Sequence, residues 1–329
     1  MRIFFVGELS DLKKQELNEK LKESEVELSK AQKKELKKLE KEYLPRLEGY
    51  ENAMKTLGER NSYSKTDPDA SFMRMKEDHM GNGQLKPAYN VQISTENQFI
   101  TEATLHQCAG DTTTLASHLD KFEADYGKQS SVIVADAGYG SEENYEMMIA
   151  KGATAYVKYP GFHAETKKKA LENPFAVQNL FYNAEKDFFV CPMGQRMTKR
   201  GIIKTKSKAG YVSEITEYQA QNCSRCPLHA LCHKSKQNRT IGINYRLNEL
   251  RKQTRQRLES EEGIKYRKRR CIEPEAVFGQ LKSNNRFQRF TFFGKKMAEM
   301  ELCLMAMGHN LRKLQANISQ KHNKIKNAA

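Results

Sequence analysis

A short apolar run that ends in a carboxylate and two glycines constrains the fold of this chain most strongly. Residues 131–135 read Ser-Val-Ile-Val-Ala, and Asp136, Gly138 and Gly140 follow. A β-branched run of this kind is typical of a strand buried on both faces of a parallel sheet, so Asp136 is predicted at the carboxyl edge, where open α/β sheets bind ligands. Ser141 can cap the next helix. On this stretch alone, a turn residue bonded to its own backbone explains Asp136 equally well.

The elements around this strand predict a mixed α/β domain. Two segments with alternating polar and apolar side chains indicate an antiparallel hairpin. A hairpin followed by alternating helices and strands is typical of a mixed sheet with helices packed on it. The predicted elements are a hairpin over 89–93 and 99–105, a helix over 111–126, the strand before Asp136, a helix to residue 150 and a strand over 155–159.

The chain from residue 10 to about 58 is rich in Lys and Glu. Its leucines recur at mostly helical spacing, which predicts a charged helical hairpin broken near residues 24–30 and again at Pro45. Acidic side chains alternate with basic ones, which favours a structural or dimer-forming role over direct DNA contact. Turn residues between 61 and 83 predict an irregular linker.

An excess of positive charge makes polyanions the natural partners of this chain. The sequence has 56 Lys and Arg residues against 41 Asp and Glu residues, a formal net charge of +15, which favours nucleic acid, although plain solvation gives the same excess. No run of about 18 apolar residues is present to cross a membrane, and the opening apolar run is too short for a signal peptide. Seven cysteines, an odd number, argue against a secreted disulfide framework. We therefore expect a cytoplasmic protein without membrane contact.

Two carboxylates that are far apart in the sequence are candidates for one metal site. Pro274 can open a helix that carries Glu275, and this helix would bring Glu275 to Asp136 if it packs beside the strand end. Converging carboxylates bind hard cations such as Mg²⁺, and two such ions about 4 Å apart support phosphodiester chemistry. Two carboxylates hold such a pair of ions poorly, so a third is expected. On spacing alone, Glu275 is more simply a solvated helix residue.

The cysteines of the basic segment 161–262 form a second candidate metal site. Cys223 and Cys226 make a CxxC pair that can present two thiolates to one tetrahedral Zn²⁺, and Cys232 with Cys191 would complete the ligands. Reduced buried thiols are the alternative. The rest of this segment is predicted to contain short elements.

Basic residues run into the Glu275 helix and follow it. Such charges suffice for contacts with the phosphate backbone, although a solvated charge run is also possible. A last helix over about 297–314, rich in Met, Leu and Ala, is predicted to be core. The candidate DNA-binding residues are Arg267, Lys268, Arg269, Arg270, Lys282, Arg286 and Arg289.

Three motifs occur in order along the chain. They are Val-Ala-Asp-Ala-Gly-Tyr-Gly-Ser at 134–141, Ile-Glu-Pro-Glu-Ala-Val-Phe-Gly-Gln-Leu-Lys at 272–282 and Gly-His-Asn-Leu at 308–311. Together they resemble DDE-type transposases of bacterial insertion sequences, and the resemblance runs from about residue 61 to 314. It implies a ribonuclease-H-like core and DNA strand cleavage and transfer with Mg²⁺ or Mn²⁺. It also implies that Asp136 is the second catalytic carboxylate and that the glutamate of the late helix is the third.

The resemblance leaves two glutamates open for the third role. The family spaces its catalytic Glu seven residues before a DNA-contacting Lys, which selects Glu275 and Lys282. Family members also often show Glu-Pro directly before Val-Phe-Gly, which keeps Glu273 as an alternative. The two glutamate side chains cannot share one helical face.

The family's first catalytic Asp lies on an early strand, in an Asp-Gly-Thr-like setting. No such motif occurs here before Ser10, and Asp67 and Asp69, in a proline turn, are the only candidates ahead of the hairpin. We therefore expect an N-terminally truncated transposase with impaired activity. The alternative is a non-catalytic DNA-binding or dimerising fragment that modulates an intact transposase.

These observations predict an α/β protein with a ribonuclease-H-like mixed sheet flanked by helices. The expected partners are element-end DNA, target DNA and a second copy in a homodimer, and the expected cofactors are Mg²⁺ or Mn²⁺ and one structural Zn²⁺. Four parts are predicted: a charged helical hairpin over 1–60, a core sheet part with the second catalytic Asp over 61–160, a basic cysteine-rich insertion over 161–262, and the Glu-bearing and C-terminal helices over 263–329.

Overall fold

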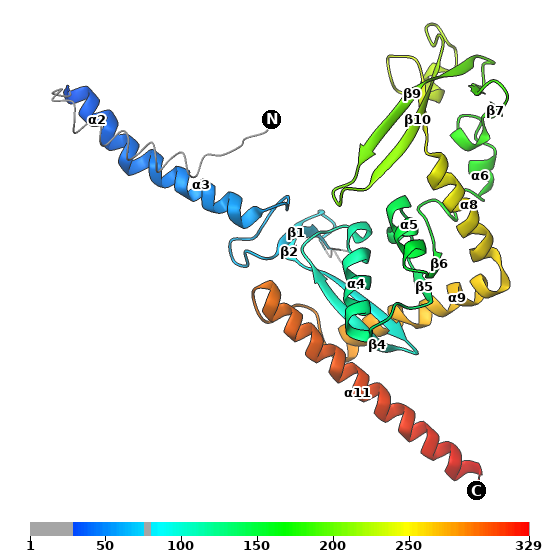
Figure 1. Cartoon of the computed structure of the whole chain (residues 1–329). Coiled ribbons are helices and arrows are strands. Elements are labelled where there is room, and N and C mark those ends of the chain that lie inside the picture. Colours follow the sequence, from blue (N-terminus) through cyan, green and yellow to red (C-terminus); the bar gives the residue numbers. More distant parts are fainter. Residues whose placement is uncertain (1–28, 76–79, 329) are drawn as a thin grey trace. The chain divides into compact units, whose positions relative to one another are not determined.

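The computed structural model describes residues 29–75 and 80–328 (Figure 1). The chain separates into two compact units, Met1–Ala88 and Tyr89–Ala329. The four-part division stays a prediction. No helix within the described ranges combines the length and the apolar character that a bilayer crossing requires.

The first unit is dominated by a continuous helical stretch. Helix α2 (Lys30–Lys38), a π-helical turn (Leu39–Tyr43) and helix α3 (Leu44–Leu57) follow one another directly. The predicted break at Pro45 was wrong because the π turn places this proline in the first turn of α3, where its missing N–H is tolerated. The other arm of the predicted hairpin lies outside the described residues.

The predicted linker contains a small antiparallel ribbon. Strand β1 (Ser71–Arg74) pairs with β2 (Leu85–Ala88), so the prediction of irregular structure throughout was wrong. The proline turn before β1 is present, since the Ala70 N–H donates to the Asp67 carbonyl oxygen at 3.0 Å. Pro87 is tolerated in β2 because a two-stranded ribbon has free edges.

The second unit opens with the predicted hairpin. Strands β3 (Asn90–Glu96) and β4 (Phe99–His106) pair antiparallel, and Asn97 and Gln98 turn the chain with positive φ angles. Helix α4 (Leu115–Tyr126) follows a short 3₁₀ turn (Asp111–Thr113). The hairpin therefore matches the alternation read from the sequence.

The strand before Asp136 is parallel to its neighbour, as predicted. Strand β5 (Val132–Ala135) pairs with β6 (Thr154–Val157) through the crossover helix α5 (Glu142–Ala150). Ser141 caps α5 by accepting a hydrogen bond from the Asn144 N–H at 3.2 Å. Of the β5 side chains only Ile133 is fully buried, so the strand is less enclosed than its β-branched run predicted.

The described strands do not form one mixed sheet. The β3–β4 hairpin and the β5–β6 pair are separate two-stranded sheets. The architecture is a mixed α/β one with helices and several sheets, which agrees with the predicted class at that level.

The cysteine-rich segment contains longer elements than predicted. Five antiparallel strands form a sheet in the order β11-β10-β9-β8-β7, and helix α8 (Tyr245–Glu259) follows it. The prediction of short elements was wrong because β9 and β10 form a long hairpin with mostly exposed side chains. The strands are β7 (Phe181–Asn183), β8 (Phe188–Val190), β9 (Arg196–Lys206), β10 (Val212–Ala220) and β11 (Thr240–Ile243), and two short helices are α6 (Lys168–Leu171) and α7 (His229–Cys232).

The late helices close the second unit. Helix α9 (Glu261–Ile272), helix α10 (Pro274–Gly279) and a π turn (Gln280–Asn284) precede the long helix α11 (Lys295–Ala328). Pro274 opens α10, as predicted. The prediction that the last helix is core holds for one face only. Ala298, Leu302 and Ala306 are buried, whereas Met297, Met300, Leu304, Met307, Leu311 and Leu314 are exposed.

His118 joins α4 to the hairpin as a buried neutral side chain. Its Nε2 lies 2.6 Å from the Ser94 hydroxyl oxygen, and its Nδ1 lies 2.7 Å from the Thr104 hydroxyl oxygen. Burial lowers the pKa of His118 from 6.5 to about 4, and the charges of His106 and Lys121 act in the same direction. Protonation of this imidazole therefore opposes folding.

We expect His118 to make the protein sensitive to acid. The unfolded chain takes up a proton at this site below pH 6.5, whereas the folded chain does so only near pH 4, so this stability is present above pH 6.5 and is lost as pH falls toward 4. The loss amounts to about 3 kcal/mol at most. Urea unfolding at several pH values should show a weaker pH dependence for His118→Gln than for the wild type. Equal slopes for the two proteins would contradict this role.

Candidate active site

Asp136 stands where β5 ends, at the carboxyl edge of the parallel pair. Its Oδ1 accepts a hydrogen bond from the Ala137 N–H at 2.8 Å, so it does bond its own backbone. Its side chain is nevertheless 59% exposed, and Oδ2 points to a basic partner. Gly140 lets β6 approach this loop, since a Cβ there would overlap the Lys158 carbonyl oxygen. The turn reading of Asp136 therefore holds for Oδ1, and the role of Asp136 as a metal ligand stays a prediction.

Arg270 brings the two predicted carboxylates together. Its Nη1 lies 3.6 Å from Asp136 Oδ2, and its Nη2 lies 2.7 Å from Glu275 Oε1. Arg270 is in the last turn of α9 and is 16% exposed, whereas Glu275 is in the first turn of α10 and is 52% exposed. The packing of α9 beside β5 thus gathers residues that are 139 positions apart in the sequence.

Glu273 points to a different place and has a different environment. Its Oε2 accepts a hydrogen bond from the Gln98 N–H at 2.8 Å, and its Oε1 accepts one from Arg269 Nε at 3.0 Å. Its side chain is 12% exposed. Glu273 therefore ties the α9–α10 corner to the turn of the β3–β4 hairpin. Of the two glutamates, only Glu275 contacts the group that also contacts Asp136.

The third motif holds α11 against the same hairpin. His309 Nε2 lies 2.8 Å from the Gln98 carbonyl oxygen. Asn310 accepts a hydrogen bond from the Ile100 N–H and donates one to the Ile100 carbonyl oxygen, both at 2.8 Å. The Asn310 side-chain amide therefore pairs with both backbone groups of Ile100, as a neighbouring strand would at the edge of β4. The 308–311 motif is therefore a structural support for the site.

Asp111 is a carboxylate near this loop and is the first residue of the helix predicted over 111–126. Its Oδ1 accepts hydrogen bonds from Asn90 Nδ2 at 2.9 Å and Gln92 Nε2 at 3.2 Å. Its Oδ2 lies against Gly138, in the loop that follows Asp136. The pKa of Tyr139 is raised, first by burial and then by the charges of Asp111 and Asp136. Asp111 comes close to the loop after Asp136 because the 3₁₀ turn Asp111–Thr113 packs against the 3₁₀ turn Ala137–Tyr139. No sequence motif indicates this contact.

The remaining acidic candidates lie in the first unit. Asp67 is buried, and its Oδ1 accepts a hydrogen bond from the Asp69 N–H at 3.2 Å. Their position relative to Asp136 is not defined, because they belong to the other unit. Across the described parts of the chain, no three His, Cys, Asp or Glu side chains are arranged to hold a metal ion.

The predicted DNA-binding residues divide into two groups. Arg269 and Arg270 form ion pairs with acidic side chains, and Arg267 lies over the Phe162 ring at 5.6 Å. The remaining four are exposed at the surface on α9, in the π turn and in the segment before α11. These are Lys268, Lys282, Arg286 and Arg289.

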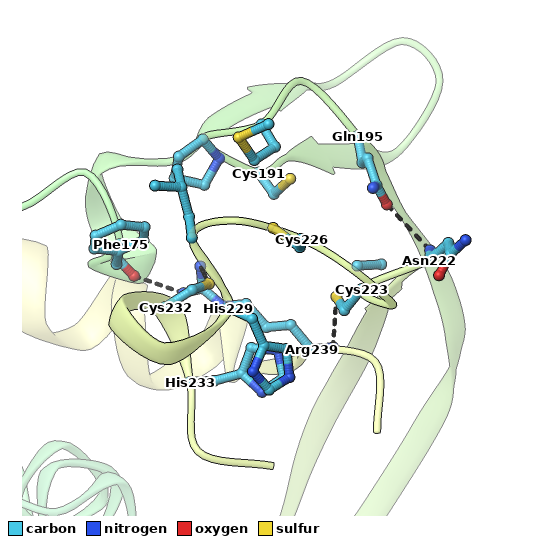
Figure 2. A pocket seen from close by; sticks show the side chains of 14 residues that line it. Phe175, Cys191, Gln195, Asn222, Cys223, Cys226, His229, Cys232, His233 and Arg239 are labelled. Atoms are coloured by element: carbon cyan, nitrogen blue, oxygen red, sulfur yellow. Dashed lines mark hydrogen bonds between the residues drawn. The ribbon is translucent and has the colours of Figure 1, made fainter. Parts of the chain in front are cut away.

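The four predicted thiols lie around a separate pocket, shown in Figure 2. Cys191 follows β8, Cys223 and Cys226 follow β10, and Cys232 ends α7. Arg239 contacts two of the sulfur atoms. Its backbone N–H donates to Cys223 Sγ at 3.3 Å, and its Nη1 donates to Cys232 Sγ at 3.2 Å. All four cysteines are free thiols.

Residues 190–315 match the family model of a transposase DDE domain. No curated protein and no solved structure matches the chain. The matched segment includes the cysteine pocket, Arg270, Glu275 and the 308–311 motif, whereas Asp136 precedes it. The match confirms the resemblance for the two later motifs, at 272–282 and 308–311, and leaves the 134–141 motif a prediction. This segment of the chain is therefore similar to the DDE domain of transposases.

The different environments of the two glutamates predict different effects on stability. Glu273→Ala leaves the Gln98 N–H and Arg269 without their partner and should lower the free energy of unfolding by about 2 kcal/mol. Glu275→Ala, at a more exposed position, should change it by less than about 0.5 kcal/mol. Urea titrations of both variants beside the wild type would measure this. Equal destabilisation by the two substitutions would show that the contacts of Glu273 are not structural.

Proposed function

We propose that this chain is the transposase of a bacterial insertion sequence, a cytoplasmic enzyme that cleaves DNA at the element ends and joins the freed 3′-hydroxyl to target DNA. The observation that carries the proposal is the convergence of Asp136 and Glu275 on Arg270 beside the end of β5. Its setting within a chain that contains a transposase DDE domain supports the same conclusion.

In this proposal Asp136 and Glu275 are catalytic carboxylates that bind Mg²⁺ or Mn²⁺. One oxygen of each exposed carboxylate faces the positive charge of Arg270, and carboxylate oxygens are suitable ligands for a hard cation. Such an ion, when bound, activates the attacking water or hydroxyl and stabilises the leaving oxygen. The Ala137 N–H holds Asp136 Oδ1, which leaves Oδ2 to face the reacting groups. Arg270 must withdraw from this position, and its charge is then available to a phosphate.

DNA contact is assigned to the exposed cations on α9, in the π turn and in the segment before α11, which are Lys268, Lys282, Arg286 and Arg289. Lys282 follows Glu275 by seven residues, as the resemblance to the family requires. A net charge of +15 supports binding to a polyanion.

The proposal includes a homodimer formed through α11. Its exposed residues Met297, Met300, Leu304, Met307, Leu311 and Leu314 recur at alternating intervals of three and four. This is the spacing of the apolar seam along which two helices pair in a coiled coil.

A second candidate function is favoured by the position of Arg270. Its guanidinium lies between the two carboxylates, where a metal ion would have to bind, and it offsets their charge without one. A chain in which Arg270 stays there would bind DNA without cutting it. It would then act as a non-catalytic fragment that modulates an intact transposase.

The two functions are separated by a nicking assay. We expect the purified chain, with Mg²⁺ or Mn²⁺, to nick a plasmid that carries the DNA flanking its own gene. Asp136→Asn and Glu275→Gln should each reduce nicking by at least about 100-fold, because each removes a metal ligand. Glu172→Gln, which changes a surface ion pair with Lys168, is the matched control and should cut normally. Binding without nicking would favour the second function, and absence of both activities at low salt would contradict both.

DNA binding itself should depend on salt through the exposed cations. The double variant Lys268→Gln, Arg289→Gln should bind DNA more weakly whatever its sequence, and the slope of log affinity against log salt should fall by about 2, since each lost phosphate contact contributes about 1. Fluorescence anisotropy at several salt concentrations would measure the slope. The control variant Lys128→Gln, Lys186→Gln also removes two exposed charges, and its slope should match the wild type. An unchanged slope in the first variant would place the DNA elsewhere.

A further inference from the structure

We propose that the pocket lined by Cys191, Cys223, Cys226 and Cys232 binds one structural Zn²⁺ through these four thiolates. The site is separate from the carboxylates at the end of β5. It draws its ligands from three places in the sequence that the five-stranded sheet brings together (Figure 2). Four sulfur ligands around one tetrahedral ion are the usual composition of a closed structural zinc site.

Two tight turns present the thiols. In the first, the Gly194 N–H donates to the Cys191 carbonyl oxygen at 2.8 Å, and Gly194 has a φ of +79°. In the second, the Cys226 N–H donates to the Cys223 carbonyl oxygen at 3.3 Å, and Arg225 has a φ of +57°. A left-handed conformation costs free energy for a residue other than glycine. A metal ion bound by Cys223 and Cys226 would offset the strain at Arg225.

Arg239 is the strongest evidence that an anionic group belongs in this pocket. The residue is only 7% exposed, yet no ion pair with a carboxylate is found for it in the described residues. Its Nη2 donates to the Phe175 carbonyl oxygen at 2.5 Å, and its Nη1 donates to Cys232 Sγ. A buried positive charge is normally paired. Four thiolates around one Zn²⁺ carry excess negative charge, and this complex would be the missing partner.

The backbone around the pocket also suits thiolate ligands. The Arg239 N–H points to Cys223 Sγ, and the Asn238 side chain fixes the same turn by accepting a hydrogen bond from the Cys223 N–H at 2.8 Å. Hydrogen bonds from N–H groups to sulfur stabilise negative charge on it and orient the ligand. These bonds form a second layer of contacts around the proposed ion.

His233 is an unexplained polar group on the same wall. Both of its ring nitrogens are buried, and neither has a hydrogen-bond partner. His233 is thus the alternative ligand on this wall, and its substitution separates it from the set of four thiolates.

The pocket has room for one ion. It encloses a cavity of about 20 Å³. No three of its Cys and His side chains are already arranged to hold a metal, so binding would turn the thiols inward. A cysteine side chain has one rotatable bond between backbone and sulfur, so a change of its staggered rotamer moves the sulfur.

A zinc ion here would stabilise a region with a small core of its own. The buried side chains between the sheet and the pocket include Phe189, Met197, Tyr218 and Ile241, with Cys191 and Cys223 packed against them. Small regions of this kind gain much of their folding free energy from metal ligands. Zinc removal should therefore loosen the β7–β11 sheet before it affects the parallel pair β5–β6.

Metal analysis of the reduced full-length chain tests the proposal. We expect about one Zn²⁺ per chain after purification without chelator. The variant Cys223→Ser, Cys226→Ser should lose nearly all of it. The control variant Cys108→Ser, Cys303→Ser replaces two exposed thiols outside the pocket and should keep full zinc content. Much less than one Zn²⁺ in the wild type, or full zinc in the first variant, would overturn the proposal.

A second measurement uses only the wild type and does not depend on the folding of a variant. Replacement of Zn²⁺ by Co²⁺ should give the strong visible and thiolate-to-metal absorption of a tetrahedral thiolate complex, and a chelator should abolish it while lowering the melting temperature. His233→Ala should keep its zinc, and loss of zinc in this variant would refute the set of four thiolates. Neither readout requires DNA cleavage, so failure here is distinct from failure of the transposase proposal.

Discussion

The arrangement of the candidate active site depends on the position of one buried guanidinium. Arg270 contacts Asp136 on one side and Glu275 on the other, and it is the common partner of two exposed carboxylates. Without a cation between them, the two negative charges would repel each other. Arg270 thus stabilises the convergence of the carboxylates while it occupies the position that the metal ion of the proposed transposase would need. The balance between these two effects decides which of the two proposed functions the chain has.

The position of Arg270 is set by contacts of residues that have no catalytic role in the proposal. Glu273 bonds the Gln98 N–H, His309 lies at the Gln98 carbonyl oxygen, and Asn310 bonds both backbone groups of Ile100. The hairpin turn and the start of β4 therefore hold α9, α10 and α11 together. Val277, Leu281 and Ala306 pack against Ile100 and bury the same junction. Two of the three family motifs thus meet on the hairpin, and only one glutamate among them faces Asp136.

Local patterns predicted much of the second unit. The β3–β4 hairpin, the β5 strand, the Ser141 cap and the start of α10 at Pro274 follow from alternation, β-branched composition and capping chemistry. The β9–β10 hairpin was missed because most side chains of β9 are exposed and carry no apolar alternation. The outer face of α11 was assigned to the core because an apolar helix face looks the same in sequence whether the domain or another helix covers it.

The sequence alone determined the resemblance to DDE-type transposases, the candidate residues and the excess of positive charge, since these reside in motifs and composition. It could not choose between Glu273 and Glu275, and it gave no reason to associate Arg239 with the cysteines or Asp111 with Asp136. The tertiary structure decided the contacts of these residues, whereas the catalytic role of Glu275 stays a proposal. The partner of Glu273 is Gln98, and that of Glu275 is Arg270, which also reaches Asp136. Contacts across such sequence separations depend on how helices pack on strands, and no local pattern encodes that packing.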